Sequence, residues 1–201
     1  MHCLFTPSCN RRRLKWGRFC RHHARKLNRY GHVLGKPIPR TTLTDFATRA
    51  ATVLKANLSH PGYQLAAQEL SNLLDQARDS VSAGGSVDEP TREYARLAKA
   101  GVTPLHILSM IAAVGIFDQA NPGFLRDTKA YRFAVARAVI GLSSKAGEVT
   151  GSRTLEAIGR RLLSLYSPLI SKVVAAIRQR QEREDKRVAA MMTPLSNINS
   201  I

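Results

Sequence analysis

Hydrophobic residues recur three and four positions apart through most of the chain after residue 42, which is the spacing of helices that bury one face. Capping residues or early prolines precede several of these segments. The pattern predicts six helices in this part of the chain, at about 42–58, 61–81, 88–101, 103–120, 127–145 and 152–192. We therefore expect a mainly α protein with a long C-terminal helix.

Three of the predicted helices carry more detailed expectations. Thr42 with Asp45 resembles a capping box at the start of the first helix. The segment that begins at Thr103 and Pro104 is apolar nearly all round, so we expect it at the centre of a helical bundle. On the helix that begins at Pro61, we expect one apolar side to pack on that bundle: Leu65, Leu70, Leu73, Leu74 and Val81.

The last helix combines an apolar side with a charged end. Pro168 removes one backbone hydrogen bond and predicts a kink. Beyond Ile177 the residues are charged and mixed in sign, which indicates an exposed helical extension. Its apolar residues predict either packing on the core or the seam of a homodimer: Leu155, Ile158, Leu162, Leu165, Leu169, Val173 and Ile177.

Positive charge is concentrated at the N-terminus. The chain has 31 Lys and Arg against 14 Asp and Glu, a net charge of +17, while residues 1–40 hold eleven cations and no acid. Such a region attracts polyanions, because each neutralised phosphate releases condensed counterions. A solvated basic tail, or a patch for acidic lipids, is the alternative. We expect these side chains to contact nucleic acid: Arg11, Arg12, Arg13, Lys15, Arg18, Arg21, Arg25, Lys26 and Arg29.

The only cysteines of the chain lie in the same basic region, with the spacing C-x5-C-x10-C-x2-H formed by Cys3, Cys9, Cys20 and His23. Three thiolates and one imidazole complete a tetrahedral shell for zinc, which accepts sulfur and nitrogen ligands. A helix near Phe19 to Asn28 would place Cys20 and His23 one turn apart on the same face. Residues 1–36 have too few apolar side chains to fold without a metal.

Other residues of this region leave alternatives open. His22 competes with His23 for the metal, and His2 is a more remote candidate. Trp16 could stack on a base, although in so small a module we expect it in the core.

The stretch from Phe19 to Gly31, FCRHHARKLNRYG, resembles the small zinc-binding module at the N-termini of bacteriophage and prophage proteins, including proteins described as HNH or recombination endonucleases. That module runs G-L-C-x-x-H-Y-x-R-x-x-R-Y-G-D-P after a pair of cysteines. The resemblance selects His23 over His22, and it implies that Arg25, Lys26 and Arg29 face a phosphate backbone. In this chain Ala24 stands where the module has an aromatic residue, and His32-Val33 stands where it has Asp-Pro.

These patterns divide the chain into a zinc-binding basic module (1–36), a linker (37–42), an all-α helical domain (43–192) and a flexible tail (193–201). Nothing in the sequence resembles a secretory signal, and the longest apolar stretch is too short to cross a bilayer. We expect a protein of the bacterial cytoplasm that does not bind membranes.

No enzyme motif is recognisable in the sequence. His60 and His106 are isolated in helical segments, where we expect ordinary helix-cap or core histidines. A nuclease is therefore disfavoured as a function. A helix-turn-helix over Ala112–Val139 is a further interpretation, since Arg126, Lys129, Arg132 and Arg137 collect there at helical spacing.

The preferred hypothesis is a phage-type, zinc-dependent nucleic-acid-binding protein of regulatory function, with DNA favoured over RNA. The alternative is a protein-interaction module that inhibits a host nucleic-acid enzyme by docking on its acidic surface. In either case the helical domain could supply homodimer contacts or bind a host or phage protein.

Overall fold

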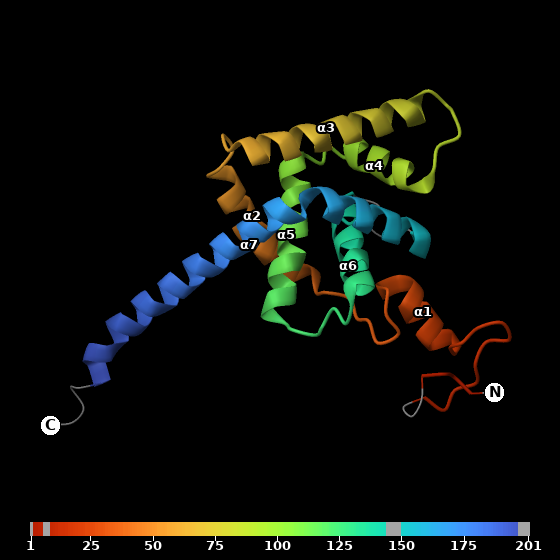
Figure 1. Cartoon of the computed structure of the whole chain (residues 1–201), viewed down its shortest axis with the longest axis horizontal. Helices are drawn as coiled ribbons and strands as arrows, with labels where there is room; N and C mark the ends of the chain where they lie inside the picture. The colour runs from red at the N-terminus through yellow and green to blue at the C-terminus, as the bar shows by residue number, and fades with distance from the viewer. Residues whose placement is uncertain (1, 6–8, 144–149, 197–201) are drawn as a thin grey trace.

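The protein is built almost entirely from helices (Figure 1), as seen in a computed structural model that describes residues 2–5, 9–143 and 150–196, with side chains as far as Ala190. The predicted mainly α class is confirmed, and within these ranges the only β pairing is an isolated bridge between His2 and Arg12. The helices are α1 (Arg21–Tyr30), α2 (Arg40–Lys55), α3 (Pro61–Ser82), α4 (Glu89–Lys99), α5 (Pro104–Ala120), α6 (Thr128–Ile140) and α7 (Ser152–Ser196).

Side chains cap four of the helices, because their first backbone N–H groups have no partner inside the helix. Asp88 accepts the N–H of Thr91 at the start of α4, and Asp127 accepts that of Ala130 at the start of α6. The two isolated histidines also take part in capping: His60 precedes α3 and accepts the N–H of Gly62, while His106, in the first turn of α5, completes a capping box with Thr103.

The start of α2 differs from the sequence prediction. Pro39 is its N-cap residue and has extended backbone angles, so α2 begins at Arg40 and no side chain caps it. The capping box expected at Thr42 is therefore wrong, and Arg40–Thr42 belong to the helix instead of the predicted linker at 37–42. The helix also ends at Lys55, three residues before the predicted Leu58.

Helix α5 lies at the centre of the bundle, as its apolar sequence predicts (Figure 1). Its residues from Ile107 to Phe117 are buried except for Met110, which is half-buried. Helices α2, α6, α7 and α3 all contact it, while α3 also packs on α4 and α6 on α7. Burial of apolar side chains in this core is the main stabilising contribution to the helical domain.

The apolar side of α3 is narrower than predicted. Leu70, Leu73 and Leu74 are buried, but Leu65 is 64% exposed and Val81 is 41% exposed. The buried stripe is completed by smaller or aromatic residues at the same three- and four-residue spacing, namely Tyr63, Ala66 and Ala77. Leu65 lies off that stripe, so the expectation that it packs is wrong, as is that for Val81.

Helix α7 packs along its first half and projects from the bundle along its second (Figure 1). The helix continues through Pro168, and Arg178 to Ala190 are exposed, which confirms the predicted extension. Leu165 is 46% exposed and Leu169 is half-buried, so packing on the core, one of the two predicted alternatives, is wrong for Leu165. The other alternative, a homodimer seam, stays a prediction. The buried stripe is Leu155, Ile158, Leu162, Tyr166, Ile170, Val173, Val174 and Ile177.

Two predicted helix ends are shifted. Helix α6 ends at Ile140, and Lys145, the predicted end, lies outside the described residues. Helix α7 continues beyond Met192 to Ser196, so Thr193–Ser196 are helical, whereas 197–201, the rest of the predicted flexible tail, lie outside the described residues.

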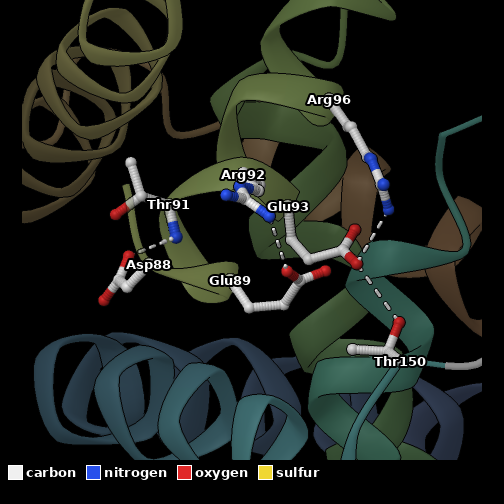
Figure 2. Close-up of polar contacts among 7 residues, drawn as sticks. All are labelled: Asp88, Glu89, Thr91, Arg92, Glu93, Arg96 and Thr150. Carbon is white, nitrogen blue, oxygen red and sulfur yellow. Dashed lines mark hydrogen bonds and ion pairs between the residues drawn. The ribbon is translucent and has the colours of Figure 1, made fainter. Parts of the chain in front are cut away.

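A buried carboxylate joins α4 to the segment before α7 (Figure 2). Glu93 is 3% exposed, and its Oε1 lies 3.1 Å from Nη1 of Arg96. Thr150 donates its hydroxyl to the same oxygen at 3.3 Å. Because a buried charge is costly unless it is paired and hydrogen-bonded, these contacts fix where the chain enters α7.

Candidate metal centre and basic surface

The structure brings together the four residues predicted to bind metal. The ligand atoms of Cys3, Cys9, Cys20 and His23 all lie within 4.8 Å of one another, and all four side chains are buried. Among the residues that the structure describes, these four side chains form a group that could hold a metal ion. The cysteines are free thiols.

Backbone hydrogen bonds bring these distant residues together. The N–H of Cys3 donates to the carbonyl of Arg11, and the N–H of Leu4 donates to that of Arg18, each at 3.0 Å. The residues around Cys3 are thereby held against both ends of the Arg11–Arg18 loop. Cys20 is the N-cap residue of α1, which places His23 one turn later on the same face, as the C-x2-H spacing predicts.

The ligand atoms surround a common centre. Nδ1 of His23 lies 3.3 Å from Sγ of Cys3 and 3.6 Å from Sγ of Cys20. The Sγ atoms of Cys9 and Cys20 are 3.8 Å apart, far beyond the length of a disulfide bond. The backbone N–H of Cys20 also donates to Sγ of Cys3 at 3.3 Å.

Local electrostatics favour the protonation states of metal ligands at two positions. The backbone N–H of His23 lowers the pKa of the Cys20 thiol, and the N-terminus of α1 favours negative charge there. Burial lowers the pKa of His23, and the electrostatic effects of the neighbouring His22, Lys26 and Arg11 lower it further. The imidazole is thus kept neutral, as a metal ligand must be.

The pKa of Cys9 moves the other way. The backbone N–H of Arg11 lowers this pKa, but burial and the thiols of Cys20 and Cys3 outweigh that effect and raise it. Three close sulfur atoms cannot all carry negative charge without a cation between them, so a metal ion would reverse this shift.

The two alternative histidines lie elsewhere. His22 and His2 are both exposed, and the candidate ligand group contains neither. Phe5 packs edge-on against His23, with ring centroids 4.8 Å apart, and Phe19 also packs on the cysteine cluster. The packing of these two phenylalanines was not predicted, although each lies within two residues of a cysteine.

Trp16 is not in a core, and the expectation that it packs inside the module is wrong. Its side chain is 92% exposed, and Nζ of Lys15 lies 5.5 Å from the centroid of its ring. The interior of the module consists of the three cysteines with Phe5 and Phe19 packed against them, and Trp16 is not part of it. Trp16 therefore presents a free aromatic surface among cations.

Three arginines form a stripe along α1. Arg21, Arg25 and Arg29 are four residues apart and all exposed, so they lie along one side of the helix. His23 lies on nearly the opposite side, given 100° of rotation per residue. The guanidinium of Arg29 also lies 5.7 Å from the ring centroid of Tyr30.

The other predicted nucleic-acid contacts are also accessible. Arg11, Arg12, Lys15 and Arg18 are exposed, while Arg13 and Lys26 are half-buried. No acid is present in this region of the sequence to neutralise them. The metal ligands and the cations thus occupy the same short segment, with the ligands inside and the cations outside.

The end of α1 packs on the helical domain through α6. Gly31 has φ of 76°, and a Cβ atom placed on it would lie 2.9 Å from the carbonyl oxygen of Lys129. Arg137 of α6 lies over the ring of Tyr30, while Lys129 and Arg132 form ion pairs with Glu156 of α7. Three of the four cations in the suggested helix-turn-helix therefore make contacts within the chain, which disfavours that interpretation.

No single helix among the described residues is long and apolar enough to cross a membrane. Helices α4 and α5 together meet the length and hydropathy requirement, but the chain bends by 117° between them.

No family model, curated protein or solved structure matches the chain.

Proposed function

We propose that the N-terminal module is a zinc-organised, nucleic-acid-binding element, with DNA favoured over RNA. One observation carries the proposal: four buried ligand atoms within 4.8 Å of one another lie inside a segment whose many cations have no acidic neighbour in the sequence. We further propose that the protein acts in the cytoplasm of a bacterium as a phage-type regulator, which rests on the resemblance of residues 19–31 to the phage module.

The spacing of the ligand atoms supports zinc as the metal. Zn–S and Zn–N bonds of about 2.3 and 2.0 Å, in a tetrahedron, separate two sulfurs by about 3.8 Å and a sulfur and a nitrogen by about 3.5 Å. The corresponding distances are 3.8 Å between the sulfurs of Cys9 and Cys20, 3.3 Å from Nδ1 of His23 to the sulfur of Cys3 and 3.6 Å to that of Cys20. His23 would bind through Nδ1.

The ion would act structurally, since three thiolates and an imidazole fill a tetrahedral shell and leave no position for substrate. Its function would be to hold Cys3 and Cys9 against the start of α1. The cations of the Arg11–Arg18 loop and of α1 would then form one fixed surface. Fixed cations lose less entropy on binding than those of a loose tail.

The cations supply affinity for nucleic acid that does not depend on its base sequence. Arg21, Arg25 and Arg29 run along α1 and suit a row of phosphates, while Trp16 is exposed for stacking on an unpaired base. Because phosphate contacts release counterions, affinity should fall steeply as salt increases.

The zinc proposal is tested on the full chain, purified without chelators and analysed for metal. We expect one zinc per chain, and loss of that zinc in Cys20→Ser. A wild-type protein without zinc, whose three thiols react freely under native conditions, would contradict the proposal.

The nucleic-acid proposal is tested with two matched triple variants and a fluorescent oligonucleotide, single-stranded or duplex. The first variant changes Arg11, Arg12 and Arg25 to Gln. The second variant changes three exposed arginines of α7 to Gln, namely Arg180, Arg183 and Arg187. Both lose the same charge. We expect only the first to weaken binding, with the salt slope on duplex DNA reduced by about 0.9 per lost phosphate contact.

The alternative function, inhibition of a host nucleic-acid enzyme, would use the same cations against an acidic protein surface. A protein that shows no salt-sensitive binding to either oligonucleotide, but retains a bacterial nucleic-acid enzyme in a pull-down, would support this alternative against the proposal.

A further inference from the structure

A cavity of about 690 Å³ lies between α2, α5 and α6, and the segment that leaves α1 closes one side of it. In Figure 1 this segment is the orange trace between α1 and α2. Small-molecule sites are typically about 300–1,000 Å³ and mostly apolar, with a few polar groups that orient the ligand. The cavity has the size and the position of such a site, and it is separate from the candidate metal centre.

The walls of the cavity are mostly apolar and continuous with the core. They include half-buried side chains that pack on the core without being covered by it, among them Ile38, Leu43, Leu105, Met110 and Leu142. An occupant with an apolar body would cover these side chains and remove them from water.

The charged residues that line the cavity are all cations. Lys36, Arg40, Lys55 and Arg137 contribute to its lining, and none of the described residues lining it is acidic. Arg137 is half-buried, and burial together with the charge of Arg29 lowers its pKa. A partly desolvated guanidinium without a carboxylate partner is favourable for a bound anion.

One buried hydroxyl in the lining has no partner. Ser109 of α5 is 3% exposed, and its Oγ makes no hydrogen bond to any described residue. Buried polar groups are nearly always hydrogen-bonded, and leaving one unpaired costs free energy. This oxygen is covered by the surrounding protein, so an occupant of the cavity would reach it only after the Ser109 side chain rotates.

We propose that this cavity binds a small organic anion with an apolar body, whose charged end meets Arg137 and its neighbouring cations and whose body covers the half-buried side chains of α2 and α5. A polynucleotide backbone does not suit the apolar walls. The wall also includes Tyr30, so the occupant would contact both the N-terminal module and the helical domain.

The test uses the full chain and isothermal titration calorimetry with decanoate, beside 1-decanol as the uncharged analogue. We expect one-to-one, saturable binding of decanoate and markedly weaker binding of decanol. Absence of saturable decanoate binding, or equal affinity for the two compounds, would overturn the proposal.

Two pairs of variants locate the site. Ala51 of α2 lines the cavity and Ala67 of α3 does not, and both are half-buried. We expect Ala51→Phe to abolish decanoate binding and Ala67→Phe to retain it. Arg137→Gln should weaken binding about tenfold, whereas Arg132→Gln, on the same helix but outside the cavity, should change it little.

Circular dichroism shows whether each variant is folded. If Ala51→Phe does not fold, the comparison of Arg137→Gln with Arg132→Gln decides whether decanoate binds in the cavity. Binding that survives a folded Ala51→Phe, or that responds equally to both arginine variants, contradicts the assignment. Oligonucleotide binding is measured separately. The cavity proposal can therefore fail while the function proposed for the basic module still holds.

Discussion

The guanidinium of Arg137 lies over the ring of Tyr30, with Cζ 5.6 Å from the ring centroid. Tyr30 is the last residue of α1 and Arg137 belongs to α6, so this contact joins the N-terminal module to the helical domain. Arg29 approaches the same ring at 5.7 Å, so two guanidinium groups share one aromatic ring. The module is therefore attached to the helical domain by side-chain contacts as well as by the chain between them.

Substitution of Gly31 tests how closely the end of α1 approaches α6. We expect Gly31→Ala to lower the free energy of unfolding by about 2–3 kcal/mol, because an alanine strains the left-handed backbone and its Cβ meets the backbone at Lys129. Gly84→Ala is the matched control, since Gly84 also has a positive φ but nothing lies within 4 Å of its Cβ position. Urea denaturation measures both, and equal losses would argue against the close contact.

Substitution of the two adjacent histidines separates the proposed metal ligand from its neighbour. His23→Ala should release zinc on dialysis and make the three thiols reactive with Ellman's reagent, because one of four ligands is lost. His22→Ala should keep both properties of the wild type, since His22 is exposed. Metal analysis and thiol titration check this prediction, and zinc loss in His22→Ala alone would reverse the ligand assignment.

Trp16 is the single tryptophan of the chain and is 92% exposed, so its fluorescence can report directly on the basic surface. We expect single-stranded DNA to quench it, and Trp16→Ala to weaken that binding by about 1–3 kcal/mol. Stability should change by less than about 0.5 kcal/mol, because the side chain buries almost nothing.

Lys15→Gln distinguishes charge from stacking at the same place. It should reduce the salt dependence of binding to single strands by about 0.7 if Lys15 contacts a phosphate, whereas Trp16→Ala should leave that slope unchanged. Fluorescence that does not respond to single-stranded DNA would argue against stacking by Trp16.

Alkaline pH should destabilise the helical domain. Burial raises the pKa of Tyr94, Tyr131 and Tyr166 from the ordinary 10.0 to about 12. Between these values the unfolded chain loses protons that the folded chain retains, so the free energy of unfolding falls as pH rises from 10.0 to about 12. Denaturation at several pH values measures the fall, and tyrosinate absorbance of the folded protein should show late-titrating tyrosines.

The helices of the C-terminal part were predictable because their signals are local. A cap such as Asp88, or the capping box at Thr103, acts on backbone groups within three residues of itself. The all-round apolar character of α5 likewise indicated its central place, since an exposed helix of that composition is unfavourable. Cys20 and His23 were recognisable for the same reason, as a pair one helical turn apart.

Contacts between distant segments were not predictable from spacing. Leu65, Val81 and Leu165 share the apolar character of their buried neighbours, but which leucine or valine is covered depends on where the other helices lie. Trp16 lies outside the interior of the module, which three thiols and two phenylalanines form, whereas composition alone favours a buried indole.

The amino-acid sequence alone determined the helical class and most of the helix starts, since each depends on hydrogen bonds between nearby residues. It also indicated the four side chains that cluster near the N-terminus, because their residue types and spacing suit one metal ion. The contact between Tyr30 and Arg137, the close approach of Gly31 to α6 and the cavity beside Ser109 exist only in the folded chain. They join residues that are far apart in the sequence, and such contacts form only where helix packing brings those residues together.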